Sequence, residues 1–251
     1  MTDQLLSVQR AARLCGRLLL ESGAEIYRVE ETVSFILTAF HVEGVSVLAL
    51  PTGVFYSFTG EDGKTIGEVI RTKVRTTDLG RVSRVNAISR DLVQGRISVE
   101  DALLRLEKEQ SRPPRPLYME LLSSAVTASA FAVLFGGNFW DFLLAFLCGI
   151  AESLLALPFR KDNVSKSVYL MLSGALCALI AMLATSLSPV FSRTPIIVGA
   201  IMPLLPGLAI TNAIRDTVTG DLVSGVARVA DALLQAVAIA AGVAIVIALW
   251  M

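Results

Sequence analysis

The chain has few of the residues from which catalytic and metal centres are most often built. It contains one histidine, His41, and three cysteines, Cys15, Cys148 and Cys177, which share no CxxC spacing. His41 has no neighbouring nucleophile and no second metal ligand, and two cysteines lie in hydrophobic runs, where this residue behaves as a small apolar side chain. We therefore expect no disulfide framework, no metal, no cofactor and no catalytic residue.

An excess of charge of either sign is also missing. The sequence holds 22 Lys and Arg and 22 Asp and Glu, so its formal net charge is +0, and it has no polybasic tail. Nucleic acid is therefore excluded as a partner, because its binding needs clustered phosphate contacts. A secretory signal peptide is excluded as well, because Arg10, Arg13 and Arg17 interrupt the first apolar stretch.

Most charged residues precede residue 116, and this half of the chain shows patterns of both helix and strand. Apolar residues at steps of three and four predict a helix over Leu5–Leu19, ended by Gly23, and a second over Ile26–Phe40 with Glu25 in its first turn. Together they predict a helical hairpin. Further on, Asp78 and Ser98 are placed to cap two more helices.

Between these helices the hydrophobic period changes to that of strands. Val45–Leu50 and Val54–Thr59 are rich in β-branched and aromatic residues and flank a Pro-Thr-Gly turn. A third strand is predicted where apolar positions alternate with Arg71, Lys73 and Arg75. This basic strand face is a candidate anion site, and a solvated sheet face is the alternative. Residues 1–112 are thus predicted to form a small cytoplasmic α/β domain.

A proline-rich linker, residues 113–116, leads into residues 117–251, which we expect to be a five-helix transmembrane domain. The fold class is therefore an α-helical membrane protein of about five transmembrane helices, preceded by that α/β domain. The expected spans are Leu117–Phe135, Phe139–Phe159, Val168–Leu187, Pro195–Ile214 and Leu233–Trp250. Basic residues gather in the loops on the side of the front domain, which predicts a cytoplasmic N-terminal domain and a periplasmic C-terminus.

Two features of the membrane half indicate a solute path. Glu152 lies deep in the second span, and an ionisable side chain at that depth more often serves function than structure. The fourth span is interrupted by helix-breaking residues and then turns polar, a pattern typical of binding sites in transporters. The residues expected on this path are Glu152, Pro203, Pro206, Gly207, Asn212, Arg215 and Asp216.

Beyond this break, Asp221, Arg228 and Asp231 are spaced by seven and three residues, which places them on one face of a helix. They are candidates for a cytoplasmic gate or ion pair. A solvated surface helix is the alternative.

Four segments carry a resemblance to a known family. They are LLESGAEIYRVEETV (19–33), ALPTGVFYSF (49–58), RVSRVNAISRDLVQG (81–95) and MPLLPGLAITNAIRDTVTGDLVSGVARVADALLQA (202–236). On them the chain resembles the threonine/serine exporter family of bacterial membrane proteins over essentially its full length. Fused members of the family have a front domain followed by about ten spans, whereas this chain has about five. It is therefore similar to the longer component of the split two-protein form.

The resemblance implies a secondary exporter of the bacterial inner membrane that moves small hydrophilic metabolites, driven by the proton motive force. Threonine and serine are the expected solutes, and some split members are associated with dicarboxylates such as succinate. It also implies a second small membrane protein of about five spans. If each partner has an odd number of spans and the two chains start from opposite faces of the membrane, they form an inverted pair. The other expected arrangement is a homo-oligomer of this chain.

Two other functions stay open at this level. One is a regulatory or scaffold subunit whose cytoplasmic domain senses a metabolite. The other is a membrane-anchored, hydrolase-like enzyme, which needs a nucleophile or metal centre that the sequence does not indicate.

Overall fold

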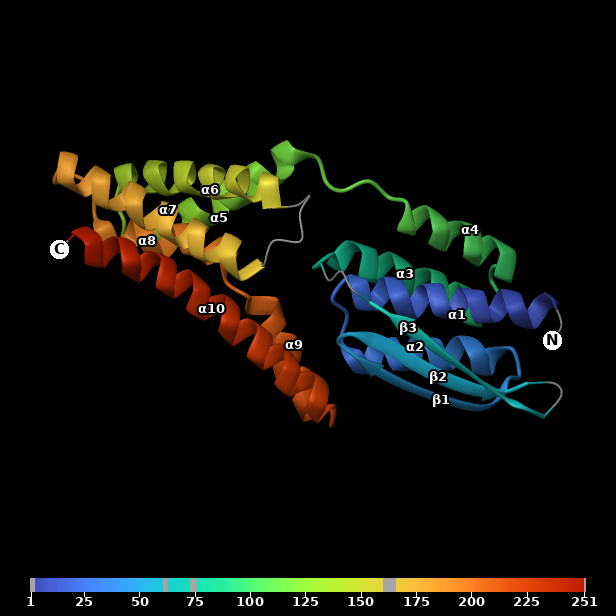
Figure 1. The fold of residues 1–251 in the computed structure, drawn as a ribbon. Helices are drawn as coiled ribbons and strands as arrows, with labels where there is room; N and C mark the ends of the chain where they lie inside the picture. The colour runs from blue at the N-terminus through green and yellow to red at the C-terminus, as the bar shows by residue number, and fades with distance from the viewer. Residues whose placement is uncertain (1–2, 61–62, 73–75, 160–165, 251) are drawn as a thin grey trace. The chain divides into compact units, whose positions relative to one another are not determined.

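The structure is a computed structural model that describes residues 3–60, 63–72, 76–159 and 166–250 (Figure 1). The chain divides into two compact units that each draw on two segments. The first unit is Met1–Pro113 with Leu208–Val229, and the second is Pro114–Gly207 with Ala230–Met251. The front segment of the first unit ends at Pro113, and a short segment from late in the chain also belongs to this unit.

The first unit begins with the predicted helical hairpin, α1 (Asp3–Glu21) and α2 (Ile26–Ala39). Gly23 ends α1 with a φ of +81°, and a Cβ at this position would lie 3.1 Å from the carbonyl oxygen of Thr76. A side chain would therefore be strained here by both conformation and space. The tight turn leaves the first backbone N–H groups of α2 without partners inside the helix.

Three antiparallel strands follow in the order β1-β2-β3: β1 (Glu43–Leu50), β2 (Gly53–Thr59) and β3 (Thr65–Arg71). The first two confirm the predicted strands and turn. The third differs, because the strand was expected over residues 70–75, whereas β3 ends at Arg71. Lys73 and Arg75 lie outside the described residues. Regular pairing from Gly53↔Arg71 to Thr59↔Thr65 sets the register of β3 on β2.

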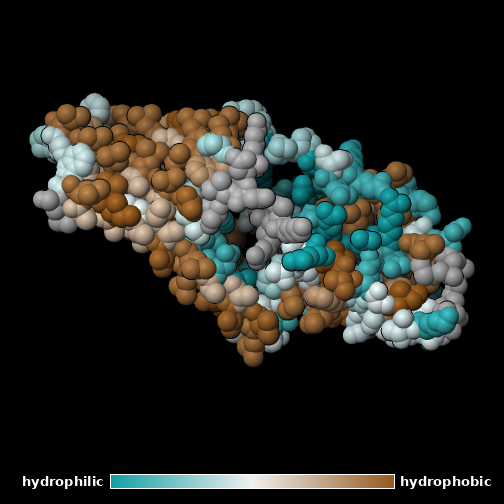
Figure 2. Space-filling view, viewed as in Figure 1, coloured by the Kyte–Doolittle hydropathy of each residue, from teal (hydrophilic) through white to brown (hydrophobic). Residues whose placement is uncertain are grey.

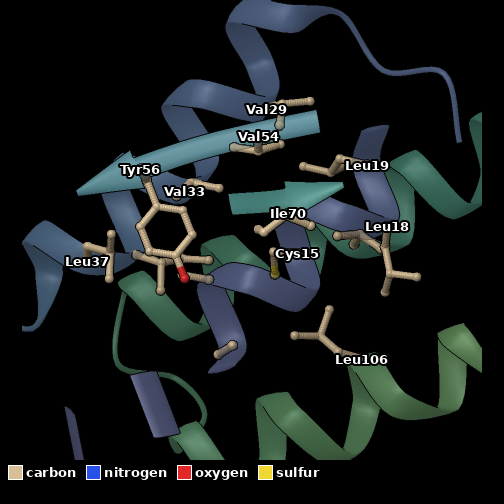
Figure 3. Close-up of a cluster of buried hydrophobic side chains, with 14 of the residues drawn as sticks. Cys15, Leu18, Leu19, Val29, Val33, Leu37, Val54, Tyr56, Ile70 and Leu106 are labelled. Atoms are coloured by element: carbon tan, nitrogen blue, oxygen red, sulfur yellow. The ribbon is translucent and has the colours of Figure 1, made fainter. Parts of the chain in front are cut away.

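One face of the sheet packs on the helices, and the core of the first unit lies between them (Figure 3). Val54, Tyr56 and Phe58 alternate inward along β2, as the two-residue period of a strand requires. Figure 3 shows Tyr56, Ile70 and Val54 directed toward Cys15 and Leu18 of α1. Burial raises the pKa of the Cys15 thiol to about 12, so this cysteine is an inert core residue.

The opposite face of the sheet carries an exposed apolar row. Leu48 pairs with Phe55, and Phe55 with Val69, across the three strands, and all three side chains are exposed. The side of β3 that faces outward therefore presents Val69 as well as Arg71, and a role of Arg71 in binding an anion stays a prediction.

Two capped helices complete the front of the first unit, α3 (Leu79–Val93) and α4 (Val99–Gln110). Asp78 accepts a hydrogen bond from the Arg81 N–H, and Ser98 accepts one from the Asp101 N–H, as predicted. Both helices pack on α1, and they also contact each other.

The second unit contains α5 (Leu117–Leu134), α6 (Phe139–Phe159), α7 (Lys166–Leu187), α8 (Arg193–Ile201) and the 3₁₀ turn η1 (Met202–Leu204). The later part of α10 (Leu222–Trp250) also belongs to it, whereas α9 (Gly207–Val218) falls almost wholly in the first unit. Among the described residues, four helices are long and apolar enough to span a membrane: α5, α6, α7 and α10. The broken pair of α8–η1 with α9 makes a fifth if it is counted as one span.

The surface of the second unit is that of a membrane protein. Large apolar side chains stay exposed along its helices, among them Leu134, Leu187 and Leu249. Figure 2 shows brown, hydrophobic residues over most of the visible face of these helices. Lipid removes the need to bury such residues, so α5, α6, α7 and α10 fit a multi-pass membrane domain. α10 begins at Leu222, eleven residues before the expected fifth span.

Candidate functional site

Polar side chains from late in the chain contact the turn between α1 and α2 and form a cluster with Glu25 of that turn. We call it the Asp216 cluster, and it comprises Glu25, Asn212, Arg215, Asp216 and Arg228. Glu25 is the N-cap residue of α2, but its side chain makes no capping hydrogen bond. Instead, Asp216 Oδ1 accepts a hydrogen bond from the Ile26 N–H at 3.2 Å. A residue 190 positions away thus satisfies an N–H group that the start of α2 leaves open.

The carbonyl groups of the same turn are also taken by this late segment. Asn212 Nδ2 donates to the Gly23 carbonyl oxygen at 3.0 Å, and Arg228 Nη2 donates to the Ala24 carbonyl oxygen at 2.8 Å. Both carbonyls follow the end of α1, where the helix has no further N–H groups to offer. Side chains of the late segment therefore bind both the backbone N–H groups and the carbonyl groups of the turn.

At the centre of the cluster, Asp216 and Arg228 form a buried ion pair. Asp216 Oδ2 lies 2.9 Å from Arg228 Nε, and the two side chains are 0% and 12% exposed. A carboxylate that is fully removed from water needs such compensation, because losing its hydration is costly. The pair holds α9 against the start of α10 and fixes both on the α1–α2 turn.

A second ion pair lies at the rim. Arg215 binds the Glu25 carboxylate, and Arg28 Nε lies 3.0 Å from the other carboxylate oxygen. Partial burial acts to raise the pKa of Glu25, but a backbone hydrogen bond and the two arginines outweigh it and lower the pKa below its usual value. Arg215 itself is half exposed, so this pair remains open to competition from a solute anion.

Glu30 lies one turn further along α2 and adds negative charge beside the cluster. Its Oε1 accepts a hydrogen bond from the Ala49 N–H at 2.7 Å. Burial raises the pKa of Glu30, the Ala49 hydrogen bond opposes that rise, and the negative charges of Asp221 and Asp216 add to it. Three carboxyl groups from α2 and the late segment therefore influence one another.

The structure shows which groups the three predicted path residues of α9 contact. Asn212, Arg215 and Asp216 all contact the α1–α2 turn. Arg228, expected with Asp221 and Asp231, is paired with Asp216. Asp221 precedes α10, and its carbonyl accepts from the Gly225 N–H, while Asp231 accepts a hydrogen bond from Gln235 Nε2. Their roles in solute contact and gating stay predictions.

The break in the fourth span lies where the sequence predicted it. Pro203 is inside η1, Leu205 has the extended backbone that precedes a proline, and Pro206 separates η1 from α9. The Gly207 N–H donates to the Leu205 carbonyl across the break. The interruption is therefore a feature of the backbone, and a solute-binding role for Pro203, Pro206 and Gly207 stays a prediction.

Glu152 occupies a different environment, inside the second unit. It lies on α6 and is 1% exposed. Ser124 Oγ of α5 donates to Glu152 Oε1, and Cys177 Sγ of α7 lies 4.0 Å from Oε2. α5 and α6 approach closely beside it, because Gly149 has no Cβ, and one would lie 2.7 Å from the Ala125 Cα. Within the described residues Glu152 has no ion-pair partner.

Asp141 is a third fully buried carboxylate, at the start of α6. Its oxygens accept hydrogen bonds from the backbone N–H groups of Asn138, at 3.0 Å, and Ser192, at 2.7 Å. Asn138 Oδ1 in turn accepts from the Asp141 N–H, which makes a reciprocal capping box. Asp141 therefore joins the α5–α6 loop to the α7–α8 loop, and the Asn-x-x-Asp spacing was the sequence signal for this role.

The third group of predicted residues is only partly described. Arg71 is exposed at the end of β3, and Lys73 and Arg75 lie outside the described residues. Among the described residues, no three His, Cys, Asp or Glu side chains gather in a way that could hold a metal ion.

Comparison with known proteins identifies the family of this chain. The model of the ThrE family, whose description reads "Putative threonine/serine exporter", matches residues 10–250. The chain is 26% identical to the "Probable succinate transporter subunit YjjP" of Escherichia coli (strain K12), over 99% of this chain and 97% of that protein. No solved structure matches the chain significantly.

Two longer relatives carry the name of exporters. The chain is 27% identical to the "Threonine/serine exporter" of Corynebacterium glutamicum, over 97% of this chain and 52% of that protein. It is 23% identical to the "Probable threonine/serine exporter" of Mycobacterium tuberculosis, over 92% of this chain and 44% of that protein. The chain therefore spans about half the length of these two relatives.

Proposed function

The chain belongs to the ThrE threonine/serine exporter family, and from this premise we propose that it is a subunit of a secondary exporter of small hydrophilic metabolites. Threonine-like and serine-like amino acids and dicarboxylates such as succinate are the proposed solute class. Support comes from relatives of both kinds, since one is named as a threonine/serine exporter and another as a succinate transporter subunit. All these solutes carry a carboxylate group.

The observation that carries this proposal is the isolated carboxyl group of Glu152. It is buried in a membrane helix between Ser124 and Cys177 and lacks an ion-pair partner among the described residues. Acidic side chains in such positions bind solute or carry protons in many transporters. We propose that Glu152 binds a proton in one state of the transport cycle and releases it in another, and that the Ser124 hydroxyl group orients it.

The Asp216 cluster supplies a second element of the mechanism. We propose that the carboxylate of the solute competes with Glu25 for Arg215, which is half exposed and already binds one carboxylate. Release of Glu25 would then loosen the contact between α9 and the α1–α2 turn. Asn212 is the proposed neutral contact to solute, and Pro203, Pro206 and Gly207 provide the break at which α9 changes position relative to η1.

The proposed location is the bacterial inner membrane, with the N-terminal domain in the cytoplasm and the C-terminus in the periplasm. The positive-inside rule supports this orientation. Arg160, Lys161 and Lys166 lie between the second and third spans, on the proposed cytoplasmic side, whereas Arg193 is the basic residue of the outer loops.

A complete exporter needs further spans in this proposal. The partner is a second small membrane protein of about five spans, or a second copy of this chain. The first arrangement is supported by the word "subunit" in the name of the relative that the chain matches over nearly its whole length. Five spans entering from the opposite face would complete an inverted pair around a central site.

Counterflow in proteoliposomes tests this proposal. Vesicles that contain the purified chain, with and without a co-expressed five-span partner, are loaded with unlabelled solute and given labelled threonine, serine or succinate outside. We expect accumulation of at least one of the three labels. If the complete assembly accumulates none of them above protein-free vesicles, the chain is not a subunit of an exporter of this solute class. Accumulation by this chain without the second protein would favour the homo-oligomer.

A further inference from the structure

A basic cavity lies between α3 and α4 in the first unit, away from the Asp216 cluster. Its volume is about 660 Å³, within the range of ligand-binding pockets. The lining includes four cationic side chains, Arg84, Arg105, Lys108 and Arg112. It is also close in sequence to the membrane, since it reaches Pro113 and the first span begins at Leu117.

Each acidic residue that lines this cavity already forms an ion pair with an arginine of this protein. Glu109 accepts a hydrogen bond from Arg84 Nε at 2.8 Å and another from Arg112 Nη1 at 3.0 Å. Asp91, the other acid of the lining, pairs with Arg96 at 3.0 Å. The four cations and two acids of the lining leave a formal charge of +2.

Two of the cations have no such partner. Arg105 and Lys108 are exposed, and neither forms an ion pair with any residue that the structure describes. They are three residues apart on α4, so they share one helix face and both line the cavity. Their charge is available to an anion from outside the protein.

The rest of the lining is three apolar residues and Ser111. Ala87 and Ile88 of α3 and Pro113 of the linker contribute carbon surface between the charged groups. Nearby, Ser111 Oγ hydrogen-bonds to the carbonyl oxygens of Glu107 and Lys108, so the end of α4 has its own capping group. An occupant that matches this cavity is amphiphilic, with an anionic group for the cations and an apolar part for Ala87, Ile88 and Pro113.

The connection to the membrane favours one such occupant. Leu117 is four residues after Pro113 in the chain, a distance of at most about 14 Å even in a fully extended chain. The end of the cavity is therefore held within headgroup reach of the start of the first span, where clustered basic residues attract anionic lipids. A site for a free metabolite does not require a position next to the membrane, whereas a site for a lipid headgroup does.

We propose that this cavity binds the phosphate-bearing headgroup and glycerol region of an anionic phospholipid. Arg105 and Lys108 contact the phosphate group, and Ala87, Ile88 and Pro113 contact the adjoining hydrocarbon. The site rests only on the presence of the membrane spans and not on the exporter function proposed above. Its occupant would fix the first unit at the membrane surface.

Photo-crosslinking of the full chain tests this assignment. The protein is reconstituted in phosphatidylcholine vesicles with a small fraction of phosphatidylglycerol that carries a photoreactive group near its glycerol backbone, and mass spectrometry locates the labelled peptides. We expect labelling within residues 84–113. The variant Arg105→Gln/Lys108→Gln should reduce it by about 25-fold in apparent affinity, roughly five-fold for each basic residue removed. The matched variant Arg17→Gln/Arg90→Gln, which removes two exposed cations elsewhere in the first unit, should label as the wild type does.

Three results would overturn the assignment. The first is equal labelling by a phosphatidylcholine probe of the same design, and the second is unchanged labelling in the Arg105→Gln/Lys108→Gln variant. The third is displacement of the probe by glycerol phosphate or inorganic phosphate at low concentration, which would identify a free phosphate compound as the ligand. Should that variant fold poorly, the wild type in rising salt replaces it, because an exposed ionic site must lose its probe as screening increases.

Discussion

Asp216 and Glu152 are both almost completely buried carboxyl groups, 0% and 1% exposed, but their surroundings are opposite. Asp216 has an arginine at 2.9 Å and a backbone N–H at 3.2 Å. Glu152 has a hydroxyl group and a thiol. The first group can stay ionised because its charge is compensated, whereas the second has no counter-charge among the described residues.

We propose that this difference separates structural from functional acids within one chain. A compensated carboxylate holds two segments together, and its removal should be read as loss of stability. An uncompensated one contributes little to folding, and its removal should be read as loss of activity. Sequence alone placed both residues on the same solute path, Glu152 for its depth in the second span and Asp216 for its place after the broken fourth span, because their partners were not visible.

The largest effect is expected for Glu152→Gln, which should abolish efflux while leaving stability within about 1 kcal/mol of the wild type. Glutamine keeps the shape of the side chain and an acceptor for the Ser124 hydroxyl group, but it cannot release a proton. Net efflux of labelled solute from preloaded vesicles under an imposed proton gradient measures the first quantity, and thermal unfolding in detergent measures the second. Ser153→Ala, on the next residue of α6, is the matched control and should transport normally. Normal efflux in Glu152→Gln would remove this residue from the mechanism.

Asp216→Ala should cost about 3–5 kcal/mol of stability, because it leaves Arg228 buried without its partner and removes the cap from Ile26. Chemical denaturation of the full chain in detergent measures this loss. The double variant Asp216→Leu/Arg228→Met is the control and should be markedly more stable than Asp216→Ala, since it leaves no buried charge. Equal stability of Asp216→Ala and the wild type would show that the pair does not hold α9 in place.

Asp141→Asn should cost about 1–3 kcal/mol, because the amide keeps one acceptor oxygen but turns N–H groups toward a backbone N–H of Asn138 or Ser192. Protein that still inserts should retain efflux, since Asp141 joins two loops. Thermal unfolding with a parallel counterflow assay checks both points. A stable variant that fails to transport would move Asp141 into the functional group with Glu152.

The smallest effect is expected for Glu25 and Arg215, whose coupling in a double-mutant cycle should be about 0.2–1 kcal/mol because Arg215 is half exposed. The folded state lowers the pKa of Glu25, so its contribution to stability is present above the usual value of 4.5 and is lost as the pH falls through the folded value. Denaturation of wild type and Glu25→Gln between pH 7 and pH 3 tests the sign. A gain in the stability of the wild type relative to Glu25→Gln on acidification would contradict it.

Local features of the first unit could be predicted from the sequence. Gly23 ended α1, Asp78 and Ser98 capped their helices, and the strands flanking the Pro-Thr-Gly turn appeared as expected, since each depends on neighbouring residues. The third strand was misplaced because alternation of apolar and basic residues does not reveal the partner strand. Pairing with β2 from Gly53 to Thr59 sets the end of β3 at Arg71.

The contacts of the candidate site could not be predicted in the same way. The break near Pro206 follows from the chemistry of proline, and it was found at its predicted place. That Asp216 binds the N-terminus of α2 is a contact across 190 residues, for which no local pattern exists. Glu25 gave a weak signal, since it stands at an N-cap position but makes no capping bond with its own side chain.

The cap of α2 also has a consequence for the order in which the protein is made. Ile26 leaves the ribosome early, whereas Asp216 and Arg228 are translated only after the first three spans. The first unit therefore lacks part of its structure throughout the synthesis of those spans and is completed by one of the last segments to appear. Its final folding step is tied to the insertion of the membrane domain, so a nascent chain arrested before residue 208 should show an α1–α2 turn that proteases can still reach.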